Sequence, residues 1–176
     1  YLWTWKINNS KETNRAMSSL GLFDSLDAFS SIRYMQRAVL LSIGSILLQE
    51  DQRTNNVICR YATDCTYTSP IVGTVWKVRV AGTNAEQASD IGSQLVKDQL
   101  CDFAVLYRYD IMKDGWAIRM RANTESKIDL TDICKNHLRN GGGHPKATGA
   151  FLDCSKGQTL RNTFIPVNVE DRFYAV

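Results

Sequence analysis

Short strand-like and helix-like hydrophobic patterns alternate along residues 57–152, and this alternation constrains the fold more than any other feature of the chain. Runs in which every second residue is apolar predict strands, and apolar residues spaced three and four apart predict helices. The predicted strands cover residues 57–67, 73–80, 103–109, 116–121 and 147–152, and the predicted helices cover residues 85–97 and 130–138. The resulting order, ββαββαβ, indicates an α/β fold class with a mixed sheet.

A longer helical pattern precedes this α/β unit. It runs from Phe29 to Glu50, and the polar stretch 51–56 predicts its end. The first twenty residues, which include Trp3 and Trp5, are expected to form a loop or short connector. We therefore predict three parts: a connector and long connecting helix over residues 1–56, an α/β domain over 57–153 and a C-terminal extension over 154–176.

The composition limits which partners and which cellular location we expect for the protein. The chain carries 21 basic and 18 acidic side chains, and this net charge of +3 neither requires nor excludes a phosphate-bearing partner. The longest apolar stretch, residues 38–48, is too short to cross a membrane, which takes about 20 residues, so no membrane association is expected. Five cysteines without a C-x-x-C pair and only two histidines predict no metal site and favour reduced thiols in a cytoplasmic protein. Because the chain opens at Tyr1, we expect it to be a piece of a longer protein.

Three consecutive glycines followed by histidine and proline form the most informative motif, Gly141-Gly142-Gly143-His144-Pro145. One glycine is enough to end the preceding helix, whereas three allow successive backbone N–H groups to turn inward on an anion. Proline restricts His144 to extended geometry and so limits where its imidazole can point. The alternative is a tight helix-to-strand turn in which His144 hydrogen-bonds only the backbone.

The strand over residues 116–121 carries two arginines on one face. Alternation places Arg119 and Arg121 together, about 7 Å apart. Exposed guanidinium groups at this spacing repel each other, but both are favoured beside phosphate, which each can bind through two hydrogen bonds. Arg108 joins them if the hairpin register places it on the same face, and the alternative is a solvated basic face. His137, in contrast, completes an apolar helical stripe and is expected at the edge of the core.

The segment 57–152 resembles the DHHA1 domain, the C-terminal substrate-recognition domain of DHH-family phosphoesterases. Three features carry the resemblance: Arg121 at the end of its strand, the helix that begins at Ile128, and the glycine–histidine run that continues to Gly149. Residues 1–50 resemble the tail of the catalytic domain and the connecting helix of the oligoribonuclease-like branch.

The chain also departs from the family pattern. Arg119 stands where the family has serine, so the arginine pair is partly particular to this chain, and Thr148 stands where the family has alanine. No Asp-His-His triplet occurs in the sequence, and the superfamily uses that motif to hold two manganese ions. The resemblance therefore extends to substrate binding and not to the metal site.

What the resemblance implies is the substrate-binding portion of a metal-dependent phosphodiesterase that hydrolyses short oligonucleotides or cyclic dinucleotides. The three glycines and His144 would bind a substrate phosphate, and Arg119 and Arg121 would hold a phosphate or a base edge. Manganese (Mn2+) would belong to a missing N-terminal DHH domain. This chain, with no cofactor of its own, is expected to bind substrate and not to cleave it.

Two other functions stay open at this stage. One is a nucleic-acid-binding accessory module, like the similar domain attached to alanyl-tRNA synthetases, which a larger basic surface would favour. The other is an oligomerisation or regulatory domain whose glycine–histidine turn is structural. In that case the long helix over residues 29–50 would bind a partner, a second copy in a homodimer being the simplest.

Overall fold

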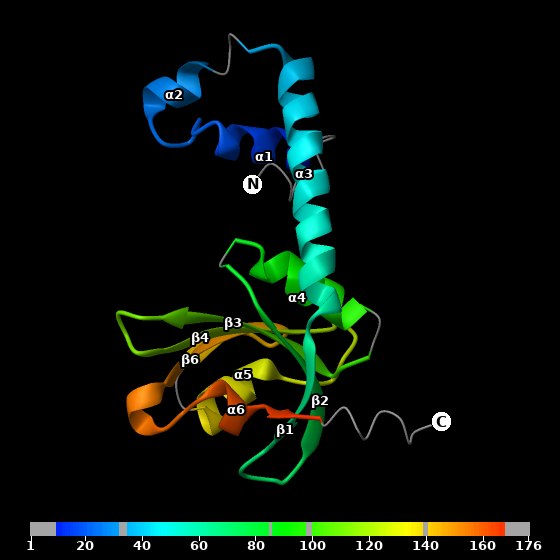
Figure 1. The fold of residues 1–176 in the computed structure, drawn as a ribbon, viewed down its shortest axis with the longest axis vertical. Coiled ribbons are helices and arrows are strands. Elements are labelled where there is room, and N and C mark those ends of the chain that lie inside the picture. The colour runs from blue at the N-terminus through cyan, green and yellow to red at the C-terminus, as the bar shows by residue number, and fades with distance from the viewer. Residues whose placement is uncertain (1–9, 32–34, 85, 98–99, 139–140, 168–176) are drawn as a thin grey trace. The chain divides into compact units, whose positions relative to one another are not determined.

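The computed structural model describes residues 10–31, 35–84, 86–97, 100–138 and 141–167. Trp3 and Trp5 lie outside the described residues. The protein has a mixed α/β fold with a seven-stranded sheet, and a long helix precedes the sheet in the sequence (Figure 1). The chain divides into two compact units, Tyr1–Thr54 and Asn55–Val176.

The first unit consists of α1 (Ser10–Ser19), α2 (Leu26–Ser30) and the N-terminal part of α3 (Arg37–Arg60). Its small core consists of Ala16, Met17, Leu22 and Leu40. Gly44 allows α1 and α3 to approach closely, because a Cβ atom at this position would lie 1.9 Å from the carbonyl oxygen of Glu12.

The helices of this unit differ from those that the sequence predicts. Residues 10–19 form α1, where the pattern predicts a loop, because the helix buries one apolar side in the small core. The helix α3 begins at Arg37, later than the predicted start at Phe29, and it continues through the polar stretch 51–56 to Arg60. That stretch contains neither glycine nor proline, so nothing in its backbone ends the helix.

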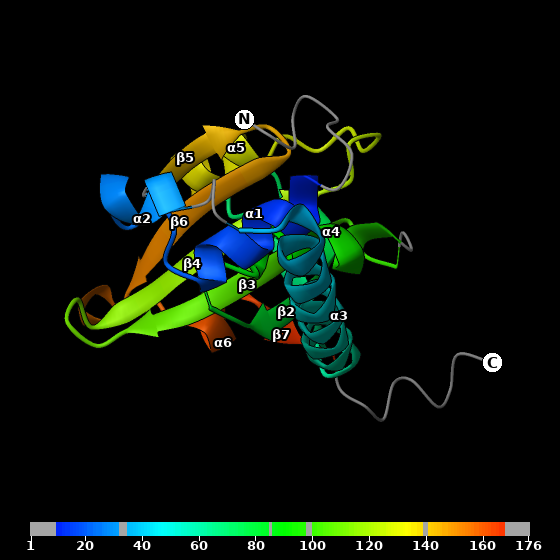
Figure 2. The same ribbon diagram turned by 90° about the horizontal axis from the view of Figure 1, so that it is seen from above.

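The second unit contains the sheet. Its strands are β1 (Thr63–Thr68), β2 (Val75–Gly82), β3 (Phe103–Asp110), β4 (Gly115–Ala122), β5 (Gly141–His144), β6 (Ala147–Asp153) and β7 (Ile165–Pro166). Its helical elements are α4 (Ala88–Lys97), α5 (Leu130–Asp132), the π-helical turn η2 (Ile133–His137), the 3-10 turn η3 (Cys154–Lys156) and α6 (Leu160–Thr163). The strand order is β5-β6-β4-β3-β2-β1-β7. The strands β2 and β3 are parallel and are connected through α4, and the other neighbours are antiparallel (Figures 1 and 2).

Three segments of this unit differ from the prediction. The first strand begins at Thr63, because residues 57–60 still belong to α3. The glycine run forms an additional strand, β5, at one edge of the sheet. Residues 154–166 form η3, α6 and β7, and β7 pairs with β1 at the other edge. The side chain of Phe164, which is 1% exposed, joins the core of the sheet.

The sheet has a different apolar layer on each face. Because side chains along a strand alternate between faces, Ile118 and Met120 of β4 lie in one layer, which α5 and η2 cover. The other layer lies under α4 and includes Ile91 of that helix and Leu106 of β3. Arg119 and its neighbours at alternate positions of β4 therefore lie on the α4 face of the sheet.

His137 lies at the edge of the first layer, where the helical stripe predicts it. Its side chain is 3% exposed. Its ring nitrogen Nδ1 is 3.2 Å from the hydroxyl oxygen of Tyr67, and Nε2 is 3.3 Å from Oγ of Ser69. Both hydrogen-bond partners come from β1 or the residue that follows it, so His137 ties η2 to the start of the β1–β2 connection.

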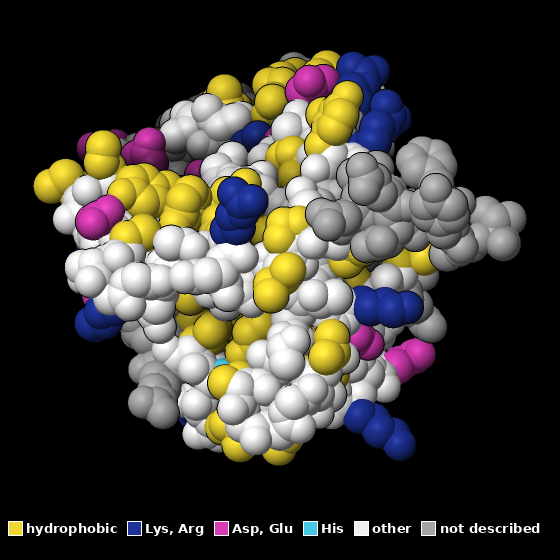
Figure 3. Space-filling model, turned by 60° about the horizontal axis from the view of Figure 1, so that its bottom comes forward, with side chains coloured by type: hydrophobic (Ala, Val, Ile, Leu, Met, Phe, Trp, Pro, Cys, Tyr) yellow, Lys and Arg dark blue, Asp and Glu magenta, His cyan; other side chains and the backbone are white. Residues whose placement is uncertain are grey.

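None of the described helices is both long enough and apolar enough to cross a bilayer. On the face seen in Figure 3, apolar side chains lie in several groups that polar side chains and backbone separate. The exposed apolar residues of the β1–β2 connection include Ile71 and Val72. Isolated apolar groups of this kind are normal on a protein surface.

Candidate functional site

The register of the β3–β4 hairpin places three arginines on the same face of the sheet. Residues directly opposite each other in an antiparallel pair point to the same side. Arg121 lies opposite Ala104, Arg119 lies opposite Leu106, and Arg108 lies opposite Ala117. Arg108 thus shares the α4 face with the two arginines of β4, which is the condition that the sequence leaves open.

This face continues across β6 and β5 without large side chains. Arg119 lies opposite Gly149 of β6, which in turn lies opposite Gly142 of β5. One row further along, Arg121 lies opposite Ala147, which lies opposite His144. Beyond Arg119, the first row contains only the two glycines. In the second row, only Ala147 lies between Arg121 and His144. We call Gly142, Ala147 and Gly149 the bare strip. Strands lie about 4.8 Å apart, so the backbone of His144 is about 10 Å from that of Arg121.

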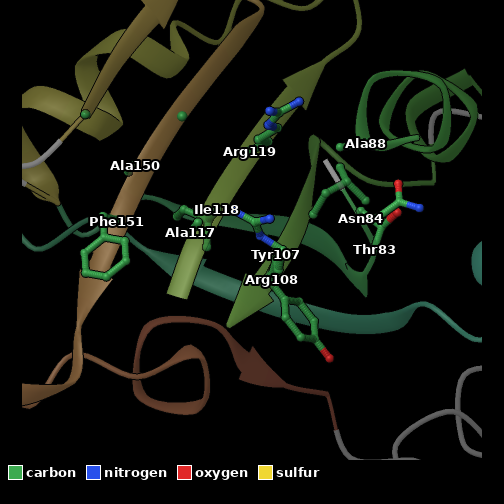
Figure 4. A pocket seen from close by; sticks show the side chains of 13 residues that line it. Thr83, Asn84, Ala88, Tyr107, Arg108, Ala117, Ile118, Arg119, Ala150 and Phe151 are labelled. Carbon is green, nitrogen blue, oxygen red and sulfur yellow. The ribbon is translucent and has the colours of Figure 1, made fainter. Parts of the chain in front are cut away.

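A pocket of about 350 Å³ lies on the α4 face (Figure 4). Of the six predicted site residues, Arg119 and Gly141 line it, and Arg108 lines it as well. Phe151 lies at one end of the pocket, and Thr83 and Asn84 lie at the other end, beside α4 (Figure 4). The remaining lining residues are Ala88, Leu106, Tyr107, Ala117, Ile118, Gly149 and Ala150. The sequence alone does not reveal the α4 end or Phe151 as lining residues, because they come from segments that are far apart in the chain.

Arg121 is held against α4 and does not line the pocket. Its Nη2 donates a hydrogen bond of 2.5 Å to Oγ of Ser89, in the first turn of α4. A Cβ atom at Gly92 would lie 3.1 Å from Cβ of Arg121, so the helix passes close above the base of this side chain. The two arginines of β4 therefore have different surroundings, although they share one face.

The glycine run has an extended conformation and not the inward-turned loop that the motif predicts. Gly141, Gly142 and Gly143 lie opposite Ala150, Gly149 and Thr148, in regular register with β6. A Cβ atom at Gly141 would lie 2.2 Å from the carbonyl oxygen of Gly149, and one at Gly143 would lie 2.6 Å from that of Ala147. These two glycines are required by the close approach of β6. Gly142 has no such requirement, since nothing lies within 4 Å of the place that a Cβ atom would occupy there.

His144 closes the hairpin between β5 and β6 and is exposed. Its Nδ1 accepts a hydrogen bond of 3.3 Å from the backbone N–H of Lys146. In the neutral ring this interaction leaves the proton on Nε2, which is then a hydrogen-bond donor. Lys146 has a structural role of its own, because its Nζ donates to the carbonyl oxygens of Ser126 and Ile128.

The α4 end of the pocket adds polar groups of another kind. Ala88, the first residue of α4, lines the pocket, so the positive end of the helix dipole lies there. Oδ1 of Asn84 accepts a hydrogen bond of 2.9 Å from the backbone N–H of Gln87. Oγ1 of Thr83 is buried and has no hydrogen-bond partner among the described residues. Together with the guanidinium groups, this end favours a ligand that carries negative charge and hydrogen-bonding groups.

Metal ions are held by groups of His, Cys, Asp or Glu side chains. Within the described ranges, no three side chains of His, Cys, Asp or Glu are grouped so that they could hold a metal ion.

Comparisons with known proteins give only distant likenesses. No family model matches the chain, and no curated protein matches it. Among solved structures, a pGpG-specific phosphodiesterase, PggH from Vibrio cholerae, is similar with a TM-score of 0.46 and 9% sequence identity, over 75% of this chain and 45% of that chain. An uncharacterized protein from Helicobacter pylori G27 is similar with a TM-score of 0.37 and 16% identity, over 79% of this chain and 32% of that chain. This chain spans less than half the length of either protein.

Proposed function

We propose that this chain is the substrate-binding part of a DHH-family phosphoesterase that acts on short oligonucleotides or cyclic dinucleotides. The observation that carries the proposal is the row arrangement on the α4 face: Arg119 and Arg121 on one side of the bare strip and His144 on the other. In this proposal Arg119 and Arg121 bind phosphate, and Nε2 of His144 donates a hydrogen bond to the same ligand.

Electrostatics support an anionic ligand. Arg108, Arg119 and Arg121 share one face, and like charges at this spacing repel one another. A phosphate group offsets the repulsion, because guanidinium groups bind it with paired, charge-assisted hydrogen bonds. The first turn of α4 adds favourable backbone dipoles at the end of the pocket that Thr83 and Asn84 line.

Shape supports a ligand with a flat or extended part. The bare strip lets a sugar or base approach the backbone of β5 and β6 closely, which larger side chains would prevent. Among the described residues, the side chains beside the strip supply hydrogen-bond donors and no carboxylate pair. This chain would therefore bind the substrate, and its own residues would not carry out hydrolysis. The manganese-dependent chemistry would be supplied by a separate catalytic domain.

Calorimetric titration of a 5′-phosphorylated dinucleotide tests the proposal. We expect Arg119→Ala and His144→Ala each to weaken binding by about 1.5–3 kcal/mol, the range for charge-assisted hydrogen bonds. Arg161→Ala is the matched control, because Arg161 is an exposed arginine of α6 and its replacement removes the same charge from the same unit. Thermal melting of each variant checks that it is folded. Failure of the wild-type chain to bind, or equal binding by the wild type and both site variants, would contradict the proposal.

A further inference from the structure

Arg108 is set apart from the other two arginines of this face. It belongs to β3, and it lies opposite Ala117 of β4. Its side chain is exposed, and no hydrogen bond or ion pair engages it within the part of the chain that the structure describes. Figure 4 shows its guanidinium group beside Ala117, whereas that of Arg119 lies further along β4. The pocket thus holds two guanidinium groups at two separate places.

Acidic groups near Arg108 do not account for its position. Asp110 lies two residues further along β3, on the same face by alternation. Its Oδ1 accepts a hydrogen bond of 3.2 Å from the backbone N–H of Met112, so this carboxylate takes part in the β3–β4 turn. Arg108 lines the pocket and is exposed, so its guanidinium group is accessible to an anionic ligand there.

An aromatic ring lies in the same row as Arg108. Phe151 of β6 is opposite Ala117, and Ala117 is opposite Arg108, so the order across the sheet is Phe151, Ala117, Arg108. The Phe151 ring passes over Gly115, where a Cβ atom would lie 2.4 Å from Cζ of the ring. The absence of a side chain at Gly115 therefore makes room for the ring, which lines the end of the pocket away from α4 (Figure 4).

This row lies one step along the strands from the row of Arg119. Ala117 and Arg119 are two positions apart along β4, which corresponds to about 7 Å. The row of Arg119 offers a guanidinium group next to the bare strip. The row of Arg108 offers a guanidinium group on one side of Ala117 and the aromatic ring of Phe151 on the other. Two adjacent rows with this chemistry match a ligand that carries two anionic groups and at least one flat base.

We propose that Arg108 and Phe151 form a second subsite, which binds the second nucleotide of a dinucleotide, the base against Phe151 and the phosphate on Arg108. This inference rests on the proposed function, in which Arg119, Arg121 and His144 bind the first phosphate. It makes Arg108 the residue by which the pocket distinguishes a dinucleotide from a mononucleotide. Base–aromatic stacking and phosphate binding by arginine are each strong enough to give that discrimination.

Two probes and two variants test the second subsite. The probes are a 5′-phosphorylated adenylyl dinucleotide and adenosine 5′-monophosphate, titrated by calorimetry against the whole chain. We expect Arg108→Gln and Phe151→Leu each to weaken dinucleotide binding about 10-fold, with mononucleotide binding nearly unchanged. Arg119→Gln should weaken both probes, and Arg161→Gln should weaken neither. Melting temperatures identify any variant that is not folded, and the leucine substitution retains most of the buried volume of Phe151.

The outcomes separate this inference from the proposed function. If the wild type binds neither probe, the proposed function fails, and the second subsite fails with it. If the wild type binds both probes and Arg108→Gln weakens both by the same factor, Arg108 contributes only general positive charge, and the second subsite is refuted while the proposed function stands. Unchanged dinucleotide binding in Phe151→Leu would refute the assignment of the base to the Phe151 ring.

Discussion

The three glycines of β5 allow a structural role to be separated from a binding role. Gly141→Ala would place a Cβ atom 2.2 Å from a carbonyl oxygen and 2.8 Å from Cβ of Ala150. Gly143→Ala would place one 2.6 Å from a carbonyl oxygen and 2.9 Å from Cα of Thr148. Contacts this short force the backbones of β5 and β6 apart, and overpacking of this kind costs about 1–3 kcal/mol. We expect both variants to lose about that much free energy of unfolding.

Gly142→Ala should behave in the opposite way. Apart from its own residue and its two chain neighbours, no described atom lies within 4 Å of the added methyl group, and the backbone there does not have a positive φ angle. Replacing glycine at such a position raises stability by about 0.4–1 kcal/mol, because the unfolded chain loses conformational freedom. The methyl group would nevertheless stand on the bare strip opposite Gly149, where the proposed ligand approaches the backbone. We expect dinucleotide binding to weaken by about 1–3 kcal/mol, a typical cost of inserting a methyl group into a filled site.

Urea denaturation of the three variants measures stability, and calorimetry measures dinucleotide affinity. In Gly142→Ala we expect stability to rise and dinucleotide affinity to fall. In Gly141→Ala we expect both stability and affinity to fall. A Gly142→Ala protein with full stability and wild-type affinity would show that the ligand does not touch the strip.

Two further predictions concern the core beside the site. Burial, with contributions from Cys134 and Asp132, raises the pKa of Tyr67 to about 12 from 10. The folded protein therefore keeps a proton that the unfolded chain releases, so stability should fall by about 2–3 kcal/mol on this account as pH rises from 10 to 12. Denaturation curves should show a shallower alkaline loss in Tyr67→Phe, and an unchanged pH profile would refute the assignment. His137→Ala should lower the free energy of unfolding by about 1–3 kcal/mol, because it leaves the buried hydroxyl group of Tyr67 without its hydrogen-bond partner. Ser69 would lose one contact only, since its Oγ also accepts hydrogen bonds from the backbone N–H groups of Ile71 and Val72. Dinucleotide affinity should stay unchanged, and a large loss of affinity at full stability would place His137 in the site instead.

Strand alternation made much of the sheet predictable. The predicted strand over residues 116–121 lies within one residue of β4 at each end, and its arginines lie on the face opposite Ile118 and Met120, as the alternation predicts. Local pattern was sufficient here because one face of the strand is buried and the other is not. The predicted end of the long helix was wrong for the converse reason. A polar stretch without glycine or proline can stay helical, and hydrophobic periodicity contains no signal for its end.

Pairing between distant segments accounts for what the sequence could not provide. Whether three glycines form a turn or an edge strand depends on the approach of β6, which the glycines themselves do not encode. Whether Arg108 joins Arg119 depends on the register of the β3–β4 hairpin, which the alternation within each strand does not determine. Phe151 of β6 and Thr83, which follows β2, line opposite ends of the same pocket and are far apart in the sequence. The motif therefore predicts a candidate region, and the fold was needed to show which residues line the pocket beside it.

The position of β5 and β6 at one edge of the sheet has a consequence for the order in which the site forms and breaks. The β3–β4 hairpin closes locally, whereas β6 joins β4 only after the intervening residues 123–146. Edge elements of this kind open at lower free energy than central strands, and amide hydrogen exchange reports such opening. A ligand that spans Arg119 and His144 can bind only the closed edge, so by mass action it would slow exchange in β5 and β6 more than in β3. Ligand binding and closure of the sheet edge would then be coupled, so that calorimetry and hydrogen exchange would report the same equilibrium.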